Sequence, residues 1–146
     1  MTDPEKFTKK SIRLIEGAVS EAQELGHTYV GSEHLLLSIC ADGTTAAAEI
    51  LISNGVAYDE LRAGIVEMVG QGAPTVLNKR YFTTAAKRIM ELAWGIAIKD
   101  IKKQAAPEHL LAAMIRESSC SASAAIKRIG GNLGGIVRRN PGCQFG

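Results

Sequence analysis

The chain has 146 residues, which suits one domain or two small halves that share a core. Apolar residues make up 46% and charged residues 22%, which excludes a disordered chain, and an aromatic share of only 5% favours packed helices over a β-sandwich. No apolar run approaches the roughly 20 residues that span a bilayer, and no signal peptide is visible. We therefore expect a cytoplasmic protein without a membrane partner, whose cysteines are reduced thiols: Cys40, Cys120 and Cys143.

The net charge of +2 hides a division between the two halves of the chain. Residues 1–71 carry five Lys/Arg against eleven acidic residues, a net charge of −6, and residues 72–146 carry twelve against four, a net charge of +8. Such a division is expected where the second half binds an anionic partner, or where the two halves attract each other. Nucleic acid is disfavoured as that partner, because the basic residues are scattered and no aromatic residues are interleaved with them.

Four helices are predicted in the first half of the chain. Thr8 can cap the first, whose apolar residues keep helical spacing until Gly26. Ser32 can cap the second and Thr44 the third, and the fourth is expected over residues 58–69. No strand pattern is found anywhere in the chain, which predicts an all-α fold.

The pattern of the first half then starts again. Phe7-Thr8 is matched by Phe82-Thr83, an offset of 75 residues, and the same offset places Glu33-His34-Leu35-Leu36 on Glu108-His109-Leu110-Leu111. Self-similarity at a fixed offset indicates an internal duplication. We therefore predict an eight-helix, pseudo-twofold domain made of two four-helix repeats. The predicted parts are repeat 1 at 7–69, a linker at 70–81, repeat 2 at 82–139 and a tail at 140–146.

The three histidines form no metal-binding or catalytic motif. A zinc-binding helix needs HExxH spacing, and His27, His34 and His109 have no histidine three or four residues away. Neither a GxSxG nucleophile elbow nor a GxxxxGK[ST] phosphate loop is present. We therefore expect no metal, no cofactor and no catalytic residue, and we interpret His34 and His109 as packing residues. A hydrolase that uses His34 or Cys120 is the enzymatic alternative.

Polar groups at the predicted helix starts are the remaining candidates for a site. Thr8 and Thr83 each precede free backbone N–H groups, which can hold an anion. Glu33 and Glu108 begin two other helices, and a carboxylate can pair with a guanidinium. Together these groups would suit a ligand that carries both charges, but threonine caps and first-turn glutamates also occur for helix stability alone.

Two stretches of the chain resemble the two repeats of the Clp N-terminal domain, of the ClpC type: FTKKSIRLIEGAVSEAQELGHTYVGSEHLLLSI and YFTTAAKRIMELAWGIAI…APEHLLAAMI. The resemblance implies a domain of a Clp AAA+ unfoldase that receives adaptor proteins and protein substrates. It implies no catalysis in the domain itself, and contact with a ClpP-type protease only through a full-length unfoldase. The alternatives are a free-standing protein of this type that acts as adaptor or decoy, and an anion- or nucleic-acid-binding helical domain.

The resemblance also implies phosphoarginine as a ligand. In ClpC relatives from Gram-positive bacteria, the glutamate of each GTEH motif meets the guanidinium, and the threonine that opens each repeat lies near the phosphate. The matching positions here are Glu33, Glu108, Thr8 and Thr83, with Ser32 in place of the first motif's threonine. Ala106-Pro107 replaces the glycine and threonine of the second motif, which removes a hydroxyl and one backbone N–H. We therefore expect a competent site in the first repeat and a weakened one in the second.

Overall fold

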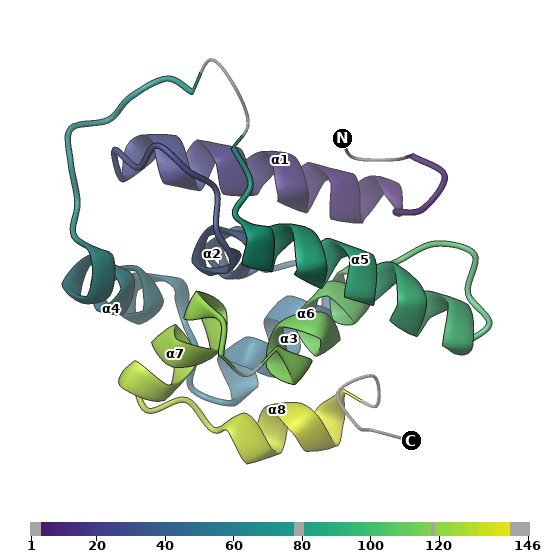
Figure 1. The fold of residues 1–146 in the computed structure, drawn as a ribbon. Coiled ribbons are helices and arrows are strands. Elements are labelled where there is room, and N and C mark those ends of the chain that lie inside the picture. Colours follow the sequence, from purple (N-terminus) through teal and green to yellow (C-terminus); the bar gives the residue numbers. More distant parts are fainter. Residues whose placement is uncertain (1–3, 78–80, 118, 141–146) are drawn as a thin grey trace.

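The computed structural model describes residues 4–77, 81–117 and 119–140, and within these ranges it holds eight helices and no strand. The helices are α1 Lys9–Glu24, α2 Ser32–Asp42, α3 Ala46–Ser53, α4 Tyr58–Val69, α5 Thr84–Lys99, α6 Pro107–Arg116, α7 Ser121–Arg128 and α8 Leu133–Arg139. In Figure 1, α1 lies at the top and α8 at the bottom, with α2, α3 and α6 between them. The predicted all-α fold of two four-helix repeats is confirmed.

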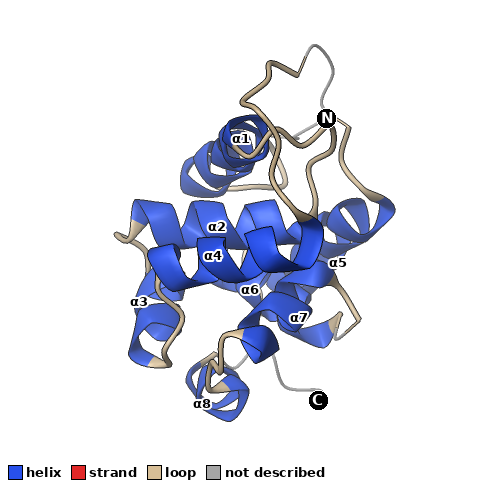
Figure 2. Ribbon diagram, turned by 90° about the vertical axis from the view of Figure 1, so that its left-hand side faces the viewer, coloured by secondary structure: helices blue, strands red, loops and turns tan. Residues whose placement is uncertain are grey.

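The helices pack closely because alanine lines their contacts. Ala18 and Ala22 are fully buried where α1 faces α2, and Ala93 and Ala97 take the equivalent places where α5 faces α6. Every residue of α2 from Ser32 to Cys40 is buried, as expected for a helix enclosed on all sides. Figure 2 shows α2 crossing the middle of the molecule beside α4, so α2 forms the centre of the core.

A short backbone contact joins the start of the first repeat to the second repeat. Phe7 and Ala105 form an isolated parallel bridge, in which Thr8 N–H donates to the Ala105 carbonyl at 3.1 Å and Ala105 N–H donates to the Lys6 carbonyl at 2.7 Å. The start of α1 is thereby fixed beside the loop that leads into α6.

The pseudo-twofold partner of this contact joins the start of the second repeat to the first. Val30 and Phe82 form the other parallel bridge, in which Val30 N–H donates to the Tyr81 carbonyl at 2.7 Å and Thr83 N–H donates to the Val30 carbonyl at 3.0 Å. Each repeat therefore begins against the loop that precedes the central helix of the other repeat.

The threonines that open the repeats cap their helices as predicted. Thr8 Oγ1 accepts a hydrogen bond from Ser11 N–H, and Thr83 Oγ1 accepts one from Ala86 N–H, both at 3.1 Å. Pro107 occupies the first position of α6, where its missing N–H would have no helical partner.

The caps predicted for the second and third helices are wrong by one residue. Gly31, not Ser32, is the N-cap of α2. Thr45, not Thr44, caps α3, because its Oγ1 accepts a hydrogen bond from Ala48 N–H at 3.1 Å. Both of the neighbouring hydroxyls are instead used in tertiary contacts, which cap propensity cannot reveal.

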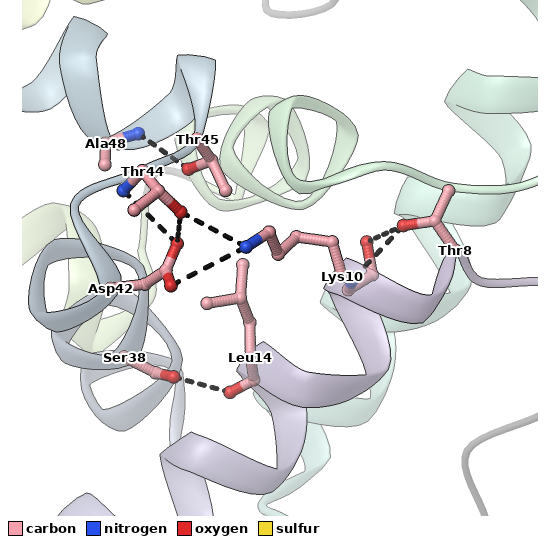
Figure 3. A network of polar contacts seen from close by, with 9 residues as sticks. Thr8, Lys10, Leu14, Ser38, Asp42, Thr44, Thr45 and Ala48 are labelled. Carbon is pink, nitrogen blue, oxygen red and sulfur yellow. Dashed lines mark hydrogen bonds and ion pairs between the residues drawn. The ribbon is translucent and has the colours of Figure 1, made fainter.

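A polar network ties the start of α1 to the end of α2 and uses the hydroxyl of Thr44 (Figure 3). Lys10 Nζ donates to Thr44 Oγ1 at 3.1 Å and lies 3.8 Å from Asp42 Oδ1. The Thr44 hydroxyl donates to Asp42 Oδ2 at 2.6 Å, and this bond, with help from Lys10, lowers the pKa of Asp42. Nearby, Ser38 Oγ donates to a carbonyl of α1 at 2.6 Å. The Lys10 ammonium therefore points away from the Thr8 cap and toward α2.

The linker between the repeats covers the C-terminal end of α1. Gly72 N–H donates to the Leu25 carbonyl and Thr75 N–H donates to the Gln23 carbonyl, both at 2.9 Å. Gly26 makes this approach feasible, since it has a φ of +72° and a Cβ there would lie 2.5 Å from a linker carbonyl oxygen. Residues 78–80 of the predicted linker lie outside the described residues, and so does all of the predicted tail except Asn140.

The position equivalent to Gly26 in the second repeat is Ile101, which has a φ of +57°. A β-branched residue in the left-handed region is strained, because its Cβ crowds the following carbonyl oxygen. The Ile101 side chain is also 93% exposed. No segment in the described ranges covers this end of α5 as the linker covers α1.

Two of the three cysteines lie in the described residues. Cys40 and Cys120 are buried free thiols, and burial raises the pKa of Cys40 to about 12; Cys143 lies outside the described residues.

In the described part of the chain, no single helix is long and apolar enough to cross a membrane. Only the bent pair α2–α3, with 96° between its helices, would pass by length and composition.

Replacing Ile101 by glycine is expected to raise the free energy of unfolding by about 1 kcal/mol, because glycine adopts the left-handed conformation without strain. The reverse change, Gly26→Ile, is expected to destabilise the protein by more than this, since it adds a clash with the linker to the same strain. Urea unfolding followed by circular dichroism would compare the two variants with the parent chain. A lower stability of the Ile101→Gly variant would show that the strain inferred at this position is absent.

Candidate functional site

The two bridges bring each capping threonine close to the glutamate motif of the opposite repeat. Thr83 is bonded to Val30, three residues before Glu33, and Thr8 is bonded to Ala105, three residues before Glu108. We call the pair of Thr83 and Glu33 site A, and the pair of Thr8 and Glu108 site B. The sequence predicted one site in each repeat, whereas the fold assembles each candidate site from both repeats.

In site A the carboxylate of Glu33 folds back over the start of its own helix. Glu33 is only 3% exposed, and a Cβ at Gly31 would collide with its Oε1. The residue equivalent to Gly31 in the second repeat is Ala106, which carries a Cβ, and Glu108 there is only half-buried. The exchange of glycine for alanine therefore explains why the two glutamates differ in exposure.

Tyr29 contacts Glu33 of site A, and no sequence motif indicates this contact. Its hydroxyl donates to Glu33 Oε2 at 3.2 Å, and its ring stacks on His27 with 5.3 Å between centroids and 4° between planes. Burial, followed by the charge of Glu33, raises the pKa of Tyr29 to about 12. The equivalent residue is Gln104, which reaches the Pro4 carbonyl instead at 3.0 Å. Within the described residues no hydrogen bond reaches the Glu108 carboxylate, so it is the more open of the two.

The two threonine hydroxyls also differ in what they can still bind. Thr8 donates its hydroxyl proton to Ser11 Oγ at 3.1 Å, and Ser11 in turn donates to the Ala105 carbonyl at 2.8 Å. Alanine at position 86 replaces this serine in the second repeat, and among the described residues no acceptor takes the hydroxyl proton of Thr83. Site A therefore keeps a hydroxyl donor that site B has used internally.

Two histidines form a buried hydrogen-bonded chain beside site A. The Gly31 N–H donates to His34 Nδ1 at 2.9 Å, so the proton of this ring must lie on Nε2, which is 2.8 Å from His27 Nδ1. His27 Nε2 then donates to the Gly70 carbonyl at 2.9 Å. Every ring nitrogen is thus assigned a role with both rings neutral, and the chain links the start of α2 to the linker.

Sequence spacing gave no sign of this pairing, because His27 and His34 lie seven residues apart across a turn. In the second repeat His109 keeps the capping part of the arrangement: its Nδ1 accepts from Ala106 N–H at 2.9 Å, and its Nε2 lies 3.4 Å from Asp100. Each histidine thus satisfies an N–H at the start of its own helix, in the manner of a capping box.

Ser32, a predicted ligand residue, is used elsewhere. It is 1% exposed, and its hydroxyl accepts a hydrogen bond from Ala122 N–H in the first turn of α7 at 3.0 Å. It therefore caps a helix of the other repeat, and we leave it out of site A.

The residues proposed for a hydrolase are not accessible. His34 is fully buried, and burial followed by the neighbouring His27 lowers the pKa of its ring to about 3. Cys120 is 4% exposed, with its Sγ 3.4 Å from the Met114 carbonyl. The described residues include no group of three His, Cys, Asp or Glu side chains that could hold a metal ion.

Two ion pairs join basic residues of the second repeat to acidic residues of the first. Arg128 Nε lies 3.4 Å from Glu67, and Arg139 donates to Glu49 at 3.0 Å. These exposed pairs contribute little stability each, about 0–1 kcal/mol, but they show the basic second half facing the acidic first half. Lys87, one turn after Thr83, remains exposed and adds positive charge at the start of α5.

Comparisons with known proteins show the family of this chain. The family model described as the Clp repeat (R) N-terminal domain matches residues 6–124 and 81–140. The chain is 34% identical to the chaperone protein ClpC1, chloroplastic, of Arabidopsis thaliana over 132 residues, which is 90% of this chain and 14% of the relative. It is 36% identical to the ATP-binding subunit ClpA homolog of Guillardia theta over 125 residues, which is 86% of this chain and 15% of the relative. The chain thus spans about one seventh of these curated relatives.

Solved structures share the fold. The N-terminal domain of the chaperone ClpD from Arabidopsis thaliana superposes with a TM-score of 0.80 at 24% identity, covering 95% of this chain and 97% of that one. The Hsp104 N-terminal domain from Candida albicans gives a TM-score of 0.74 at 15% identity, with 93% and 89% coverage.

The stability of the domain is expected to fall as the pH drops below about 6.5, with His34 as one cause. Because the folded pKa of about 3 lies below the ordinary value of 6.5, the unfolded chain takes up this proton first. The contribution of His34 is therefore complete above pH 6.5 and is lost toward pH 3, by up to about 1.4 kcal/mol per pH unit.

The variant His34→Gln isolates this contribution, since glutamine can still accept from Gly31 N–H but does not titrate. Denaturant unfolding at several pH values between 7 and 4 should show a shallower loss of stability in the variant. Parallel curves for the two proteins would rule out the neutral histidine chain.

Proposed function

The chain belongs to the Clp repeat (R) N-terminal domain family, and on that basis we propose that it recruits protein substrates or adaptor proteins to a Clp-type ATP-dependent unfoldase. The relatives it matches are named as Clp chaperones and as ATP-binding subunits of the Clp protease. A ClpP-type protease would be reached only through such an unfoldase. The alternative is a free-standing protein that acts as an adaptor or decoy. The expected cytoplasmic location stays a prediction, because several of the relatives are named as chloroplast proteins.

The ligand that we propose for sites A and B is phosphoarginine on a marked protein. The observation that supports this proposal is the backbone contact between Thr83, at a helix start that can hold an anion, and Val30, which lies three residues before Glu33. A phosphorylated guanidinium has a negative phosphoryl group and several N–H donors in one plane. The first suits the Thr83 hydroxyl, the free N–H groups of α5 and the nearby Lys87, and the second suits a carboxylate.

We propose that site A is the stronger of the two, once Tyr29 has moved. The hydroxyl of Tyr29 gives Glu33 a single hydrogen bond, and a guanidinium would replace it with two parallel bonds between opposite charges. Site B offers the more exposed glutamate, but its threonine hydroxyl is bonded to Ser11 and its Pro107 supplies no N–H. Site B would therefore exchange ligands more easily and hold them less tightly.

A nucleic-acid-binding helical domain is less well supported as a function. Arg128 and Arg139 of the basic half already pair with acidic residues of the first repeat, which reduces the charge available for a phosphate backbone.

Calorimetric titration with free phosphoarginine tests both the ligand and the composition of the sites. Glu33→Gln should weaken the tighter binding step about tenfold to a hundredfold, the range expected for a hydrogen bond to a charged group. Glu108→Gln should affect only the weaker step. Because Thr83 and Glu33 share a site, the double variant Thr83→Val/Glu33→Gln should lose less than the sum of the two single losses.

The matched control combines two residues that belong to the same repeat but to different sites. In the double variant Thr8→Val/Glu33→Gln, the losses of binding free energy should be additive. Coupling between Thr8 and Glu33 would mean that each site is built within one repeat. Equal losses from Glu33→Gln and Glu108→Gln would remove the proposed asymmetry. Absence of any binding would leave adaptor docking without this ligand.

Removing the hydroxyl of Tyr29 should strengthen phosphoarginine binding at site A. In the variant Tyr29→Phe the guanidinium no longer competes with a hydrogen bond to Glu33, and a gain of up to about tenfold is expected. The same change in a Glu33→Gln background should have little effect, which serves as the control. Weaker binding by Tyr29→Phe would mean that this hydroxyl contacts the ligand directly.

A further inference from the structure

The first repeat contains its own example of a chain segment docked on the end of a helix. The linker lies extended along the C-terminal end of α1, where Gly72 and Thr75 donate their N–H groups to the carbonyls of Leu25 and Gln23. The N–H of Leu77 extends the contact by donating to the side chain of Gln23 at 3.0 Å. Three backbone donors, spread over six residues, thus bind the end of one helix.

The second repeat presents the same acceptors without such a segment. At the same offset of 75 residues, Leu25 and Gln23 correspond to Asp100 and Ile98. The Ile98 carbonyl accepts from N–H groups of the same turn, those of Asp100 and Ile101, and in the described ranges no donor reaches the Asp100 carbonyl. The end of α5 therefore retains the hydrogen-bonding capacity that the linker uses on α1.

Two exposed isoleucines mark the same end of α5. Ile98 is 51% exposed and Ile101 is 93% exposed, and Ile101 also holds a left-handed backbone that glycine holds at the equivalent position. Neither isoleucine is among the side chains that pack on the hydrophobic core of the described residues. A strained apolar side chain that points into solvent indicates a contact made with another molecule.

The charge around these isoleucines indicates what kind of segment would fit. Lys99, Lys102 and Lys103 are all exposed at this end of α5, and Lys99 stands where the first repeat has Glu24. Within the described residues these lysines form no ion pair, and their three charges outnumber that of the exposed Asp100 carboxylate beside them, so they can attract an acidic partner.

We propose that the C-terminal end of α5, with Ile98, Ile101 and the three lysines, docks an extended acidic segment of a partner protein. The segment would lie as the linker lies on α1, giving its N–H groups to the carbonyls of Asp100 and Ile98. Its apolar residues would cover the isoleucines, and its carboxylates would face the lysines. This surface shares no residue with sites A and B, so it does not depend on phosphoarginine binding.

Nuclear magnetic resonance of the ¹⁵N-labelled chain, titrated with short peptides, tests this proposal. The probes are an acetylated peptide with the sequence of residues 70–77, GQGAPTVL, and two versions with aspartate or lysine at its second and sixth positions. The aspartate peptide should shift the backbone amides of residues 98–103, and it should bind about tenfold more tightly than the lysine peptide. Added salt should reduce this difference.

A matched pair of variants distinguishes docking at the end of α5 from non-specific peptide binding. Ile101→Asn keeps a residue that tolerates the left-handed region and should abolish the shifts, whereas Val76→Asn, at a linker position that is 78% exposed, should leave them unchanged. Thermal unfolding would show that both variants are folded. Equal affinity for the aspartate and lysine peptides would overturn the proposal. So would chemical shift changes that occur only at residues other than 98–103. Shifts at 98–103 that depend on protein concentration without peptide would assign the surface to a second copy of the chain.

Discussion

Reciprocal backbone pairing between the repeats is the constraint on which the rest of the structure depends. Each repeat begins with two or three residues that pair in parallel with the loop before the central helix of the other repeat, through Phe7 and Ala105 on one side and Phe82 and Val30 on the other. The N–H groups of Thr8 and Thr83 find their carbonyl acceptors in the opposite repeat, at Ala105 and Val30. The two candidate sites are therefore a property of the assembled pair.

The same exchange extends from backbone to side chains. Ser32 caps α7 across the repeat boundary, and this leaves the start of its own helix to the glycine before it and to His34. A histidine that caps must stay neutral and keep its Nδ1 unprotonated, which is why its burial and its second hydrogen bond to His27 are compatible. Both histidines therefore have structural roles, and the proposed ligand contacts are made by the neighbouring residues Thr83 and Glu33.

The sequence predicts well the features that depend on neighbours along the chain. The duplication, the eight helices and the caps at Thr8 and Thr83 follow from periodicity and from hydroxyls within one turn of the N–H they bond. The pairing of His27 with His34 and the role of Ser32 depend on turns and on a helix 90 residues away, so no local spacing encodes them. The difference between Gly31 and Ala106 was visible in the sequence. Its effect on the exposure of the two glutamates became clear only from the backbone, which shows how close the Glu33 carboxylate comes to Gly31.

Divergence between the repeats follows one physical rule at two places. Where the first repeat has glycine, a close approach is made: Gly26 admits the linker and Gly31 admits the carboxylate of Glu33. Where the second repeat has Ile101 and Ala106, the approach is absent, so that Ile101 is exposed and Glu108 is only half-buried. A duplicated domain needs only one copy of each contact to hold its shared core together, so the second copy is free to leave those surfaces open. The more open glutamate of site B and the uncovered end of α5 thus both lie where the second repeat has a larger residue in place of glycine.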